Sequence, residues 1–398
     1  MRNYKQLLII AFFLPILSFS DNNSVYAGEV RGVTKDTIKI GSIVDLTGPA
    51  AWYGKQSSTA SQTLFRHIND QGGILGRKIK MSIQDNSYSS TKTVAALKLL
   101  ISRYEIFCLS DILGSTPMQA AFPLIKDEKI VTFPQLSLSS LMHEPLKRYV
   151  FTATTPASDQ VFIAVDFILR DLNAKVPKLA MVYTDDEYGK DGLKGFLKAA
   201  EAYDLEVVAR ETYKRGAIDY SSQVVNLRRA NPDYIFHSGV YSSFAAVLNE
   251  ARKLGWSPLF FSDAASSTPK FLKLAGDAAK GGYVLTYIEM GDTRGMRKLK
   301  KITSKYVKDA VIDYMYVGGW TNTQILIEGL RRAGRDLTPD RLVTALESIR
   351  NFNTGGLIGP VSYSYNNHKG GGYAKVQKVN IEKNAFLTLT SWREPSVK

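Results

Sequence analysis

The feature that most constrains this chain is a repeated alternation of short β-rich runs with longer helical stretches. Ile79, Met81 and Ile83 alternate with polar residues, as expected of a strand with one buried face. The stretch from Tyr53 to Asn69 instead repeats its apolar residues at helical spacing, and Gly72-Gly73 ends it. Strands that alternate with helices favour an α/β fold with a parallel sheet covered by helices.

The alternation runs through two sets of strands, separated at Thr154-Thr155-Pro156. The first set is expected at Ile38 to Ile40, Ile79 to Ile83, Ile106 to Leu109 and Ile130 to Phe133. The second set is expected at Lys178 to Tyr183, Glu206 to Thr212, Tyr234 to His237 and Leu259 to Phe261. Two doubly wound halves are therefore predicted. Helices at Tyr316 to Ala333 and Pro339 to Ile349 then precede a β-rich tail from Val361. Such a tail is unexpected after a second sheet that is already complete.

The N-terminus resembles an export signal. Arg2 and Lys5 precede an apolar run from Leu7 to Phe19, and Val25 and Ala27 supply small residues for cleavage. The apolar run is shorter than the roughly 20 residues that span a bilayer. Residues 1–27 are therefore predicted to be a signal peptide cleaved after Ala27, which leaves an exported, periplasmic protein.

Charge and cysteine content narrow the functional classes. The formal net charge is +14, and removal of the predicted signal peptide leaves +13. The basic residues are spread through helices such as Arg294 to Lys308, so a solvated basic face is favoured over nucleic-acid binding. Cys108 is the single cysteine and lies in an apolar run, which favours a buried core residue. One thiol and four scattered histidines predict no metal site and no cofactor.

Polar and aromatic residues follow the expected strands, where ligands bind in open parallel sheets. The segments are Asp45 to Tyr53, Asp85 to Tyr88, Ser110 to Thr116, Pro134 to Ser139, Thr184 to Tyr188, Ser238 to Tyr241 and Ser262 to Ser267. Turns between strands and helices also favour Ser, Thr and Asp simply as helix caps. Seven such segments together indicate a site for a small polar ligand.

Several motifs resemble one known family. They are Leu46-Thr47-Gly48-Pro49, Tyr53-Gly54, the run from Ile68 to Arg77, Asp85-Asn86, Asp186 to Gly189, Asn231-Pro232-Asp233, the run from Ala251 to Gly255, and Gly355 to Pro360. With these motifs, nearly all of the chain after the signal peptide resembles the periplasmic leucine/isoleucine/valine-binding proteins. These are the substrate-binding subunits of amino-acid ABC transporters. Tyr88 and Leu113 stand where some members carry a disulfide.

The resemblance implies a type I periplasmic binding protein fold, with two parallel-sheet lobes joined by a three-strand hinge. Lobe 1 is then expected at 28–150 and 288–356, and lobe 2 at 151–287 and 357–398. The expected function is capture of an amino acid, branched-chain or related, for delivery to a membrane permease by a monomeric protein. Amides and aromatic acids stay open as ligands, and a sensor that partners a receptor stays open as a role.

An amino acid is a zwitterion, so its pocket needs donors, acceptors and an apolar wall. Ser115 and Thr116 open a helix before Pro117, and the resemblance favours them as carboxylate ligands over a plain cap. It also places Ser137 and Ser139 against the polar end of the ligand, with Gln135 assisting. A solvated serine-rich loop is the alternative for those serines.

The remaining candidates are aromatic or acidic. Trp52, Tyr53, Tyr188 and Tyr241 are expected to clasp the ligand side chain, although ordinary packing explains such residues equally well. The resemblance calls for an acid after the strand Leu259 to Phe261 to hold the ligand ammonium. Asp263 is that acid, with helix capping as its alternative and Asp185 in reserve. We find no enzyme motif such as a P-loop, H-E-x-x-H or G-x-S-x-G, so no catalytic residues are assigned.

Overall fold

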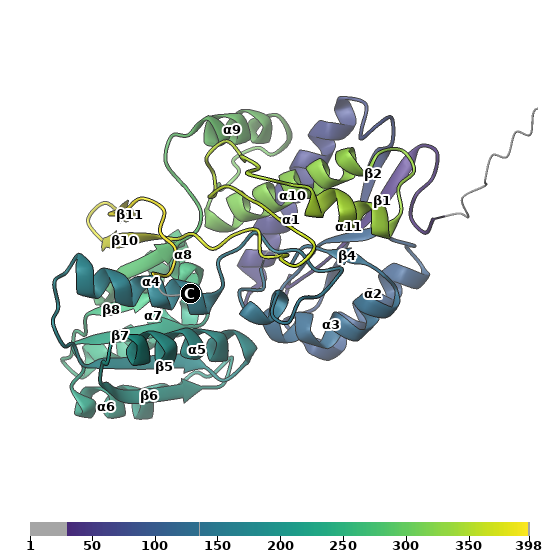
Figure 1. The fold of residues 1–398 in the computed structure, drawn as a ribbon. Helices are drawn as coiled ribbons and strands as arrows, with labels where there is room; N and C mark the ends of the chain where they lie inside the picture. Colours follow the sequence, from purple (N-terminus) through teal and green to yellow (C-terminus); the bar gives the residue numbers. More distant parts are fainter. Residues whose placement is uncertain (1–29, 135, 397–398) are drawn as a thin grey trace, which may run out of the picture.

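A computed structural model of the chain describes residues 30–134 and 136–396, which form two lobes (Figure 1). Each lobe is built on one sheet, of four strands in the first lobe and seven in the second. The predicted signal peptide and its cleavage site lie outside the described residues, as does Gln135. None of the described helices is both long enough and apolar enough to cross a membrane.

The sheet of the first lobe is fully parallel, with the order β2-β1-β3-β4. Its strands are β1 (Thr37–Val44), β2 (Lys78–Asp85), β3 (Cys108–Ile112) and β4 (Val131–Thr132). The connecting helices are α1 (Ala51–Asp70), α2 (Ser90–Ser102) and α3 (Ser115–Asp127). Ile38, Ile40 and Ile43 of β1 are buried because helices cover the parallel sheet. Cys108 is fully buried in β3, and burial raises the pKa of its thiol.

Three later helices complete the first lobe, although the second lobe precedes them in the sequence (Figure 1). They are α9 (Arg294–Tyr306), α10 (Tyr314–Ala333) and α11 (Pro339–Glu347). Helix α10 packs closely on α1, because Gly319 has no side chain there. A Cβ at that position would lie 2.5 Å from the carbonyl oxygen of Ser57. The close approach buries Trp320 and Tyr316 in the core of this lobe.

The sheet of the second lobe has the order β11-β10-β9-β8-β7-β5-β6. Its parallel strands are β5 (Leu179–Thr184), β6 (Val207–Tyr213), β7 (Tyr234–Ser238), β8 (Phe260–Ser262) and β9 (Tyr283–Thr286). Its helices are α4 (Ala157–Arg170), α5 (Glu187–Ala202), α6 (Ser221–Ala230), α7 (Tyr241–Lys253) and α8 (Pro269–Ala275). Two short 3₁₀ turns of this lobe lie at η2 (Ala264–Ser266) and η3 (Gly276–Ala279). A third, η1 (Ser140–Met142), follows β4 in the first lobe.

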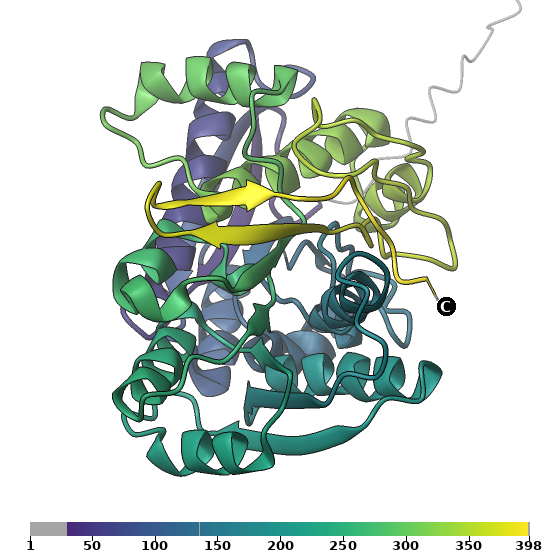
Figure 2. The same cartoon turned by 90° about the vertical axis from the view of Figure 1, so that its left-hand side faces the viewer.

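The β-rich tail completes the second sheet. Strand β10 (Lys375–Asn380) pairs antiparallel with β9, and β11 (Ala385–Thr388) pairs antiparallel with β10 (Figure 2). The prediction of two doubly wound halves is therefore confirmed, with one difference. The sheet of the second lobe is mixed, because its last two strands come from the tail rather than from a βα repeat.

The chain passes between the lobes three times: after β4, after β9 and before β10. Backbone hydrogen bonds tie these crossings together. The Thr152 amide donates to the His368 carbonyl oxygen at 3.0 Å, and the Glu289 amide donates to the Leu357 carbonyl oxygen at 2.7 Å. The lobes are thus joined by a bundle of adjacent segments, as the family resemblance implied for the hinge.

Candidate functional site

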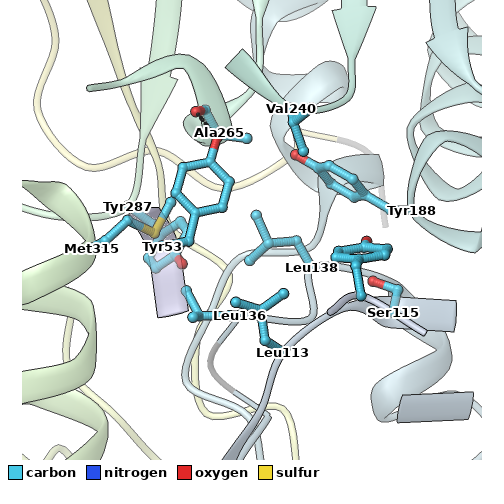
Figure 3. A pocket seen from close by; sticks show the side chains of 11 residues that line it. Tyr53, Leu113, Ser115, Leu136, Leu138, Tyr188, Val240, Ala265, Tyr287 and Met315 are labelled. Carbon is cyan, nitrogen blue, oxygen red and sulfur yellow. Dashed lines mark hydrogen bonds between the residues drawn. The ribbon is translucent and has the colours of Figure 1, made fainter. Parts of the chain in front are cut away.

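A cavity lies where the two lobes face each other (Figure 3). Its described lining consists of Tyr53, Tyr88, Leu113, Ser115, Leu136, Leu138 and Met315 from the first lobe, Tyr188, Val240 and Ala265 from the second lobe, and Tyr287 after β9. The cavity encloses about 400 Å³ between atoms, measured out to its mouth. The Tyr53 hydroxyl of the first lobe bonds the Ala265 carbonyl oxygen of the second lobe beside it, so the lobes are in contact over the cavity.

The carboxyl ends of the strands build this cavity, as expected for parallel sheets. Tyr53 lies in the first turns of α1 after β1, Ser115 opens α3 after β3, and Tyr188 lies in the first turn of α5 after β5. The loop before α1 is held by Asp45, whose carboxylate accepts from the amides of Gly48 at 2.5 Å and Ala50 at 2.8 Å. Tyr53 is therefore presented from a fixed turn.

Most of the lining is apolar. Figure 3 shows Tyr53 and Tyr188 on opposite sides of the cavity, with Leu138 between them and Leu136 and Leu113 below. None of the described lining residues is an acid, a lysine or an arginine. The cavity is thus suited to a ligand that is mainly hydrocarbon.

Two polar atoms in the lining lack partners. The hydroxyls of Ser115 and Tyr188 are buried without a hydrogen-bond partner among the described residues. Burial and the nearby Asp263 carboxylate raise the pKa of Tyr188 well above its usual value. The phenol therefore keeps its proton, and the Asp263 carboxylate is the acceptor nearest to it. Buried polar groups are almost always hydrogen-bonded, so these two hydroxyls mark a place where a ligand would complete the structure.

Tyr53 joins the two lobes directly. Its hydroxyl donates to the Ala265 carbonyl oxygen at 2.7 Å and accepts from the Tyr241 amide at 3.3 Å. The rings of Tyr53 and Tyr241 also pack, with centroids 5.4 Å apart. Tyr241 thus supports Tyr53 and does not itself line the cavity.

Two cation–π contacts also cross from lobe to lobe. The guanidinium of Arg215 lies 4.0 Å from the ring centroid of Tyr88, and the Lys270 ammonium lies 4.5 Å from that of Trp52. The Trp52 indole N–H donates to Asp313 at 2.7 Å. Trp52 is therefore part of the contact between the lobes and lies outside the cavity lining.

The other predicted hydroxyl residues bond to protein groups outside the lining. The Thr116 hydroxyl accepts from the Glu187 amide at 3.2 Å, and the Ser139 hydroxyl donates to the Glu187 carboxylate at 2.8 Å. The Ser137 hydroxyl donates to the Ile112 carbonyl oxygen at 2.9 Å. Thr116 and Ser139 thus hold the lobes together, while Ser137 stabilises its own loop.

Asp263 is buried and also lies outside the lining. One carboxylate oxygen accepts from the Ser238 hydroxyl at 2.8 Å and the other from the Ala265 amide at 3.1 Å, which caps η2. Burial raises its pKa to about 6. No salt bridge joins Asp263 to a cation in the described part of the chain. Asp185, the reserve candidate, is exposed and paired with Lys190 at 3.0 Å.

Most of the apolar lining was missed at the sequence level, although its position was indicated. Tyr88, Leu113, Leu136 and Leu138 all lie within the strand-end segments, where only polar and a few aromatic residues were selected. Tyr287 had no such signal, because the strand before it was not predicted. No group of three His, Cys, Asp or Glu residues suited to a metal is found among the described residues.

Comparison with known proteins identifies the family. A family model described as periplasmic binding protein matches residues 37–385. The Leu/Ile/Val-binding protein of Escherichia coli (strain K12) is 23% identical over 246 residues, which is 62% of this chain. The match spans 66% of that relative, just under two thirds of its length.

Solved structures share the fold over nearly the whole chain. A fatty acid ABC transporter substrate-binding protein from Thermomonospora curvata superposes with a TM-score of 0.82 at 26% identity, covering 92% of this chain and 95% of that one. A branched chain amino acid ABC transporter protein from Thermus thermophilus, with bound valine, gives a TM-score of 0.83 at 22% identity over 92% and 98%. The fold is the type I periplasmic binding protein fold, and the chain belongs to the periplasmic binding protein family.

Proposed function

We propose that this protein is an extracytoplasmic substrate-binding protein that captures an amino acid, branched-chain or related, and delivers it to an ABC transporter permease. The observation that carries the proposal is the cavity, which both lobes line and the hinge segment at Tyr287 borders. A ligand held there contacts both lobes at once, so its binding energy favours the closed arrangement over an open one.

The contacts between the lobes support a cleft that opens and closes. They are small and polar or aromatic, and they include the Tyr53 hydroxyl on Ala265, Arg215 over Tyr88, and Lys270 over Trp52. Each contributes about 0.5 to 1.5 kcal/mol. Contacts of this size break readily, and entry of a ligand requires that they do.

The experiment uses the protein after removal of the signal peptide. Native mass spectrometry of the purified protein is expected to reveal a co-purified small molecule. Once this ligand has been removed, calorimetry with added ligand should show binding, and X-ray scattering should show a smaller radius of gyration at saturation. An unchanged radius at confirmed occupancy would refute the hinged-cleft mechanism.

The remaining features of the proposal concern location and organisation. We propose export to the periplasm as a monomer, with cleavage after Ala27, so that N-terminal sequencing of the periplasmic protein begins at Gly28. We also propose lobe boundaries at 28–150 with 288–356 and at 151–287 with 357–398. The placement of α9 to α11 with the first sheet, and of β10 and β11 with the second, supports this division.

A further inference from the structure

We propose that the basic face of helix α9 binds the anionic headgroups of a phospholipid membrane. The basic face consists of the exposed cations on the segment 294–308, which contains no acidic residue: Arg294, Arg297, Lys298, Lys300, Lys301, Lys305 and Lys308. A basic amphipathic helix is a pattern typical of membrane-surface binding. The contact goes beyond ligand capture, because it would hold the protein on the surface in which the proposed permease lies.

The opposite side of α9 is fixed in the first lobe. Met296, Leu299 and Ile302 are buried in the core of that lobe. Gly295 packs so closely that a Cβ there would lie 2.8 Å from the Gly355 carbonyl oxygen. Figure 1 shows α9 at the top edge of the first lobe, on the side away from the sheet of the second lobe. The cations are therefore presented to solvent from a rigid support.

Most of these cations have no acidic partner in the protein. Arg297 pairs with Asp292 at 2.8 Å, and Lys305 pairs with Asp70 at 2.8 Å. Across the described residues, no salt bridge is formed by the other five cations of the basic face, which are Arg294, Lys298, Lys300, Lys301 and Lys308. Their charges are available to an external anion.

The arrangement of the cations is unfavourable for the helix itself. Arg294 and Arg297 lie at the start of α9, where the positive end of the helix dipole repels them. Lys298 follows Arg294 by four residues, and like charges at that spacing repel each other. Burial, Lys298 and Lys305 together lower the pKa of His67, so the positive field reaches the neighbouring helix α1. A partner that supplies negative charge would relieve this repulsion.

An anionic membrane supplies negative charge over a wide and flat area. Helix α9 has 13 residues and is therefore about 20 Å long, so its cations can meet several headgroups at once. Its apolar side is occupied by the core of the first lobe, which leaves charge as the main source of attraction. Such attraction grows with the number of cations and is screened by salt.

Sedimentation with vesicles tests the inference on the full mature protein. Vesicles of phosphatidylcholine with about 30% phosphatidylglycerol are compared with vesicles of phosphatidylcholine alone. We expect binding to the anionic vesicles only. The affinity should fall about tenfold or more when the ionic strength rises from about 0.05 to about 0.5 M.

A triple variant removes charge from the basic face: Lys298→Gln, Lys300→Gln and Lys301→Gln. Its affinity for the anionic vesicles should fall about thirtyfold. Its thermal midpoint should be unchanged or higher, because the helix loses like-charge repulsion and no ion pair described in the structure. Arginine at the same three positions keeps the charge and should keep the binding.

A matched control removes the same net charge from the second lobe: Lys175→Gln, Lys280→Gln and Lys383→Gln. These three lysines are exposed, and none of them forms a salt bridge with another described residue. The control should lose less than about threefold in affinity for the anionic vesicles, because its lysines lie outside the basic face.

Three outcomes would overturn the inference. They are no binding to the anionic vesicles, equal binding to both kinds of vesicle, and equal weakening in the two triple variants, which would assign the attraction to overall charge. In the first case, retention on heparin that is lost in the α9 variant would identify a different polyanion as the partner. The cavity takes no part in these measurements, so the proposed function is tested separately by calorimetry and scattering.

Discussion

The Tyr53 hydroxyl of the first lobe donates a hydrogen bond of 2.7 Å to the Ala265 carbonyl oxygen of the second lobe. The same hydroxyl accepts from the Tyr241 amide, so one oxygen atom links α1 to two segments across the cleft. Tyr53 also lines the cavity. Ligand contact and lobe closure therefore share a single side chain.

Tyr53→Phe is expected to weaken ligand binding about fivefold, because it removes a hydrogen bond that exists only when the lobes are closed. The ring stays, so packing in the cavity is preserved. Tyr306→Phe is the matched control, since its hydroxyl bonds Asp70 at 2.7 Å on the surface of the first lobe. Calorimetry measures both affinities. Equal affinities in the two variants would show that the Tyr53 hydroxyl does not contribute to closure.

Lys270→Met is expected to weaken binding about two- to fivefold through loss of the cation–π contact with Trp52. Methionine keeps much of the aliphatic stem, so the change isolates the charge. Lys305→Met is the control, because Lys305 lies 4.7 Å from the Tyr306 ring centroid within the first lobe. Scattering on the ligand-free variants should show a larger radius of gyration for Lys270→Met only; the same radius in both would contradict the prediction.

Ser115→Ala is expected to lower ligand affinity about tenfold while leaving the thermal midpoint nearly unchanged, because the Ser115 hydroxyl has no protein partner among the described residues to lose. Ser137→Ala is the matched control, and the opposite effects are expected of it. That hydroxyl donates to the Ile112 carbonyl oxygen at 2.9 Å outside the cavity, so stability should fall by about 1 kcal/mol with affinity unchanged. Lost stability with unchanged affinity in Ser115→Ala would show that the Ser115 hydroxyl does not contact the ligand.

The sequence predicted the sheets better than the cavity. Strand β5 is an almost continuous apolar run, and burial between helices demands that pattern locally. Strand β9 was missed, because it is short and its neighbour β10 comes from about 90 residues further along the chain. The pairing of β9 with β10 is therefore visible only in the folded structure.

The cavity lies at the strand-end segments predicted from the sequence, but only part of its lining was named by residue. Strand ends are set by the parallel topology, so Tyr53, Ser115 and Tyr188 could be placed from the sequence. Which side chain in a loop faces the cavity depends on backbone angles. Tyr88, for example, has φ of +57°, and no local pattern predicts that geometry for a tyrosine. Leu136 and Leu138 were passed over because polar residues beside them suggested ligand contacts.

His237 is expected to stay neutral in the folded protein at pH 5. It is fully buried, its Nε2 lies 2.9 Å from the Tyr213 hydroxyl, and burial lowers its pKa to about 3. The unfolded chain takes up the proton near pH 6.5, so stability from this residue is complete above that pH and is lost as pH falls, by about 4 kcal/mol near pH 3.

Imidazole NMR titration measures the state of His237 directly. His67 is the internal control, because it is only partly buried and its pKa is lowered by burial and by Lys298 and Lys305. Its resonances should shift with pH while those of His237 stay constant down to pH 5. A titration of His237 near pH 6 would contradict the prediction, because it would show that the core of the second lobe accommodates a protonated imidazole.

Asp263 has the opposite pH dependence. Its pKa is about 6 in the folded protein, against about 4 in an unfolded chain, so the folded state holds the extra proton between these values. Its contribution to stability is therefore greatest below pH 4 and falls as pH rises to 6. The side chain in Asp263→Asn cannot ionise, so the variant does not lose this stability as pH rises. The difference in unfolding free energy between the variant and the natural protein should therefore shift in favour of the variant by about 2 to 3 kcal/mol from pH 4 to pH 7.

The same variant tests whether Asp263 contributes to ligand binding. Its carboxylate caps η2 and bonds Ser238, and it lies outside the cavity lining, so Asp263→Asn should leave the affinity for L-leucine within about twofold. Urea unfolding at several pH values and calorimetry at pH 7 measure the two effects separately. A tenfold or greater loss of L-leucine binding would instead make Asp263 the acceptor for the ammonium group of the ligand.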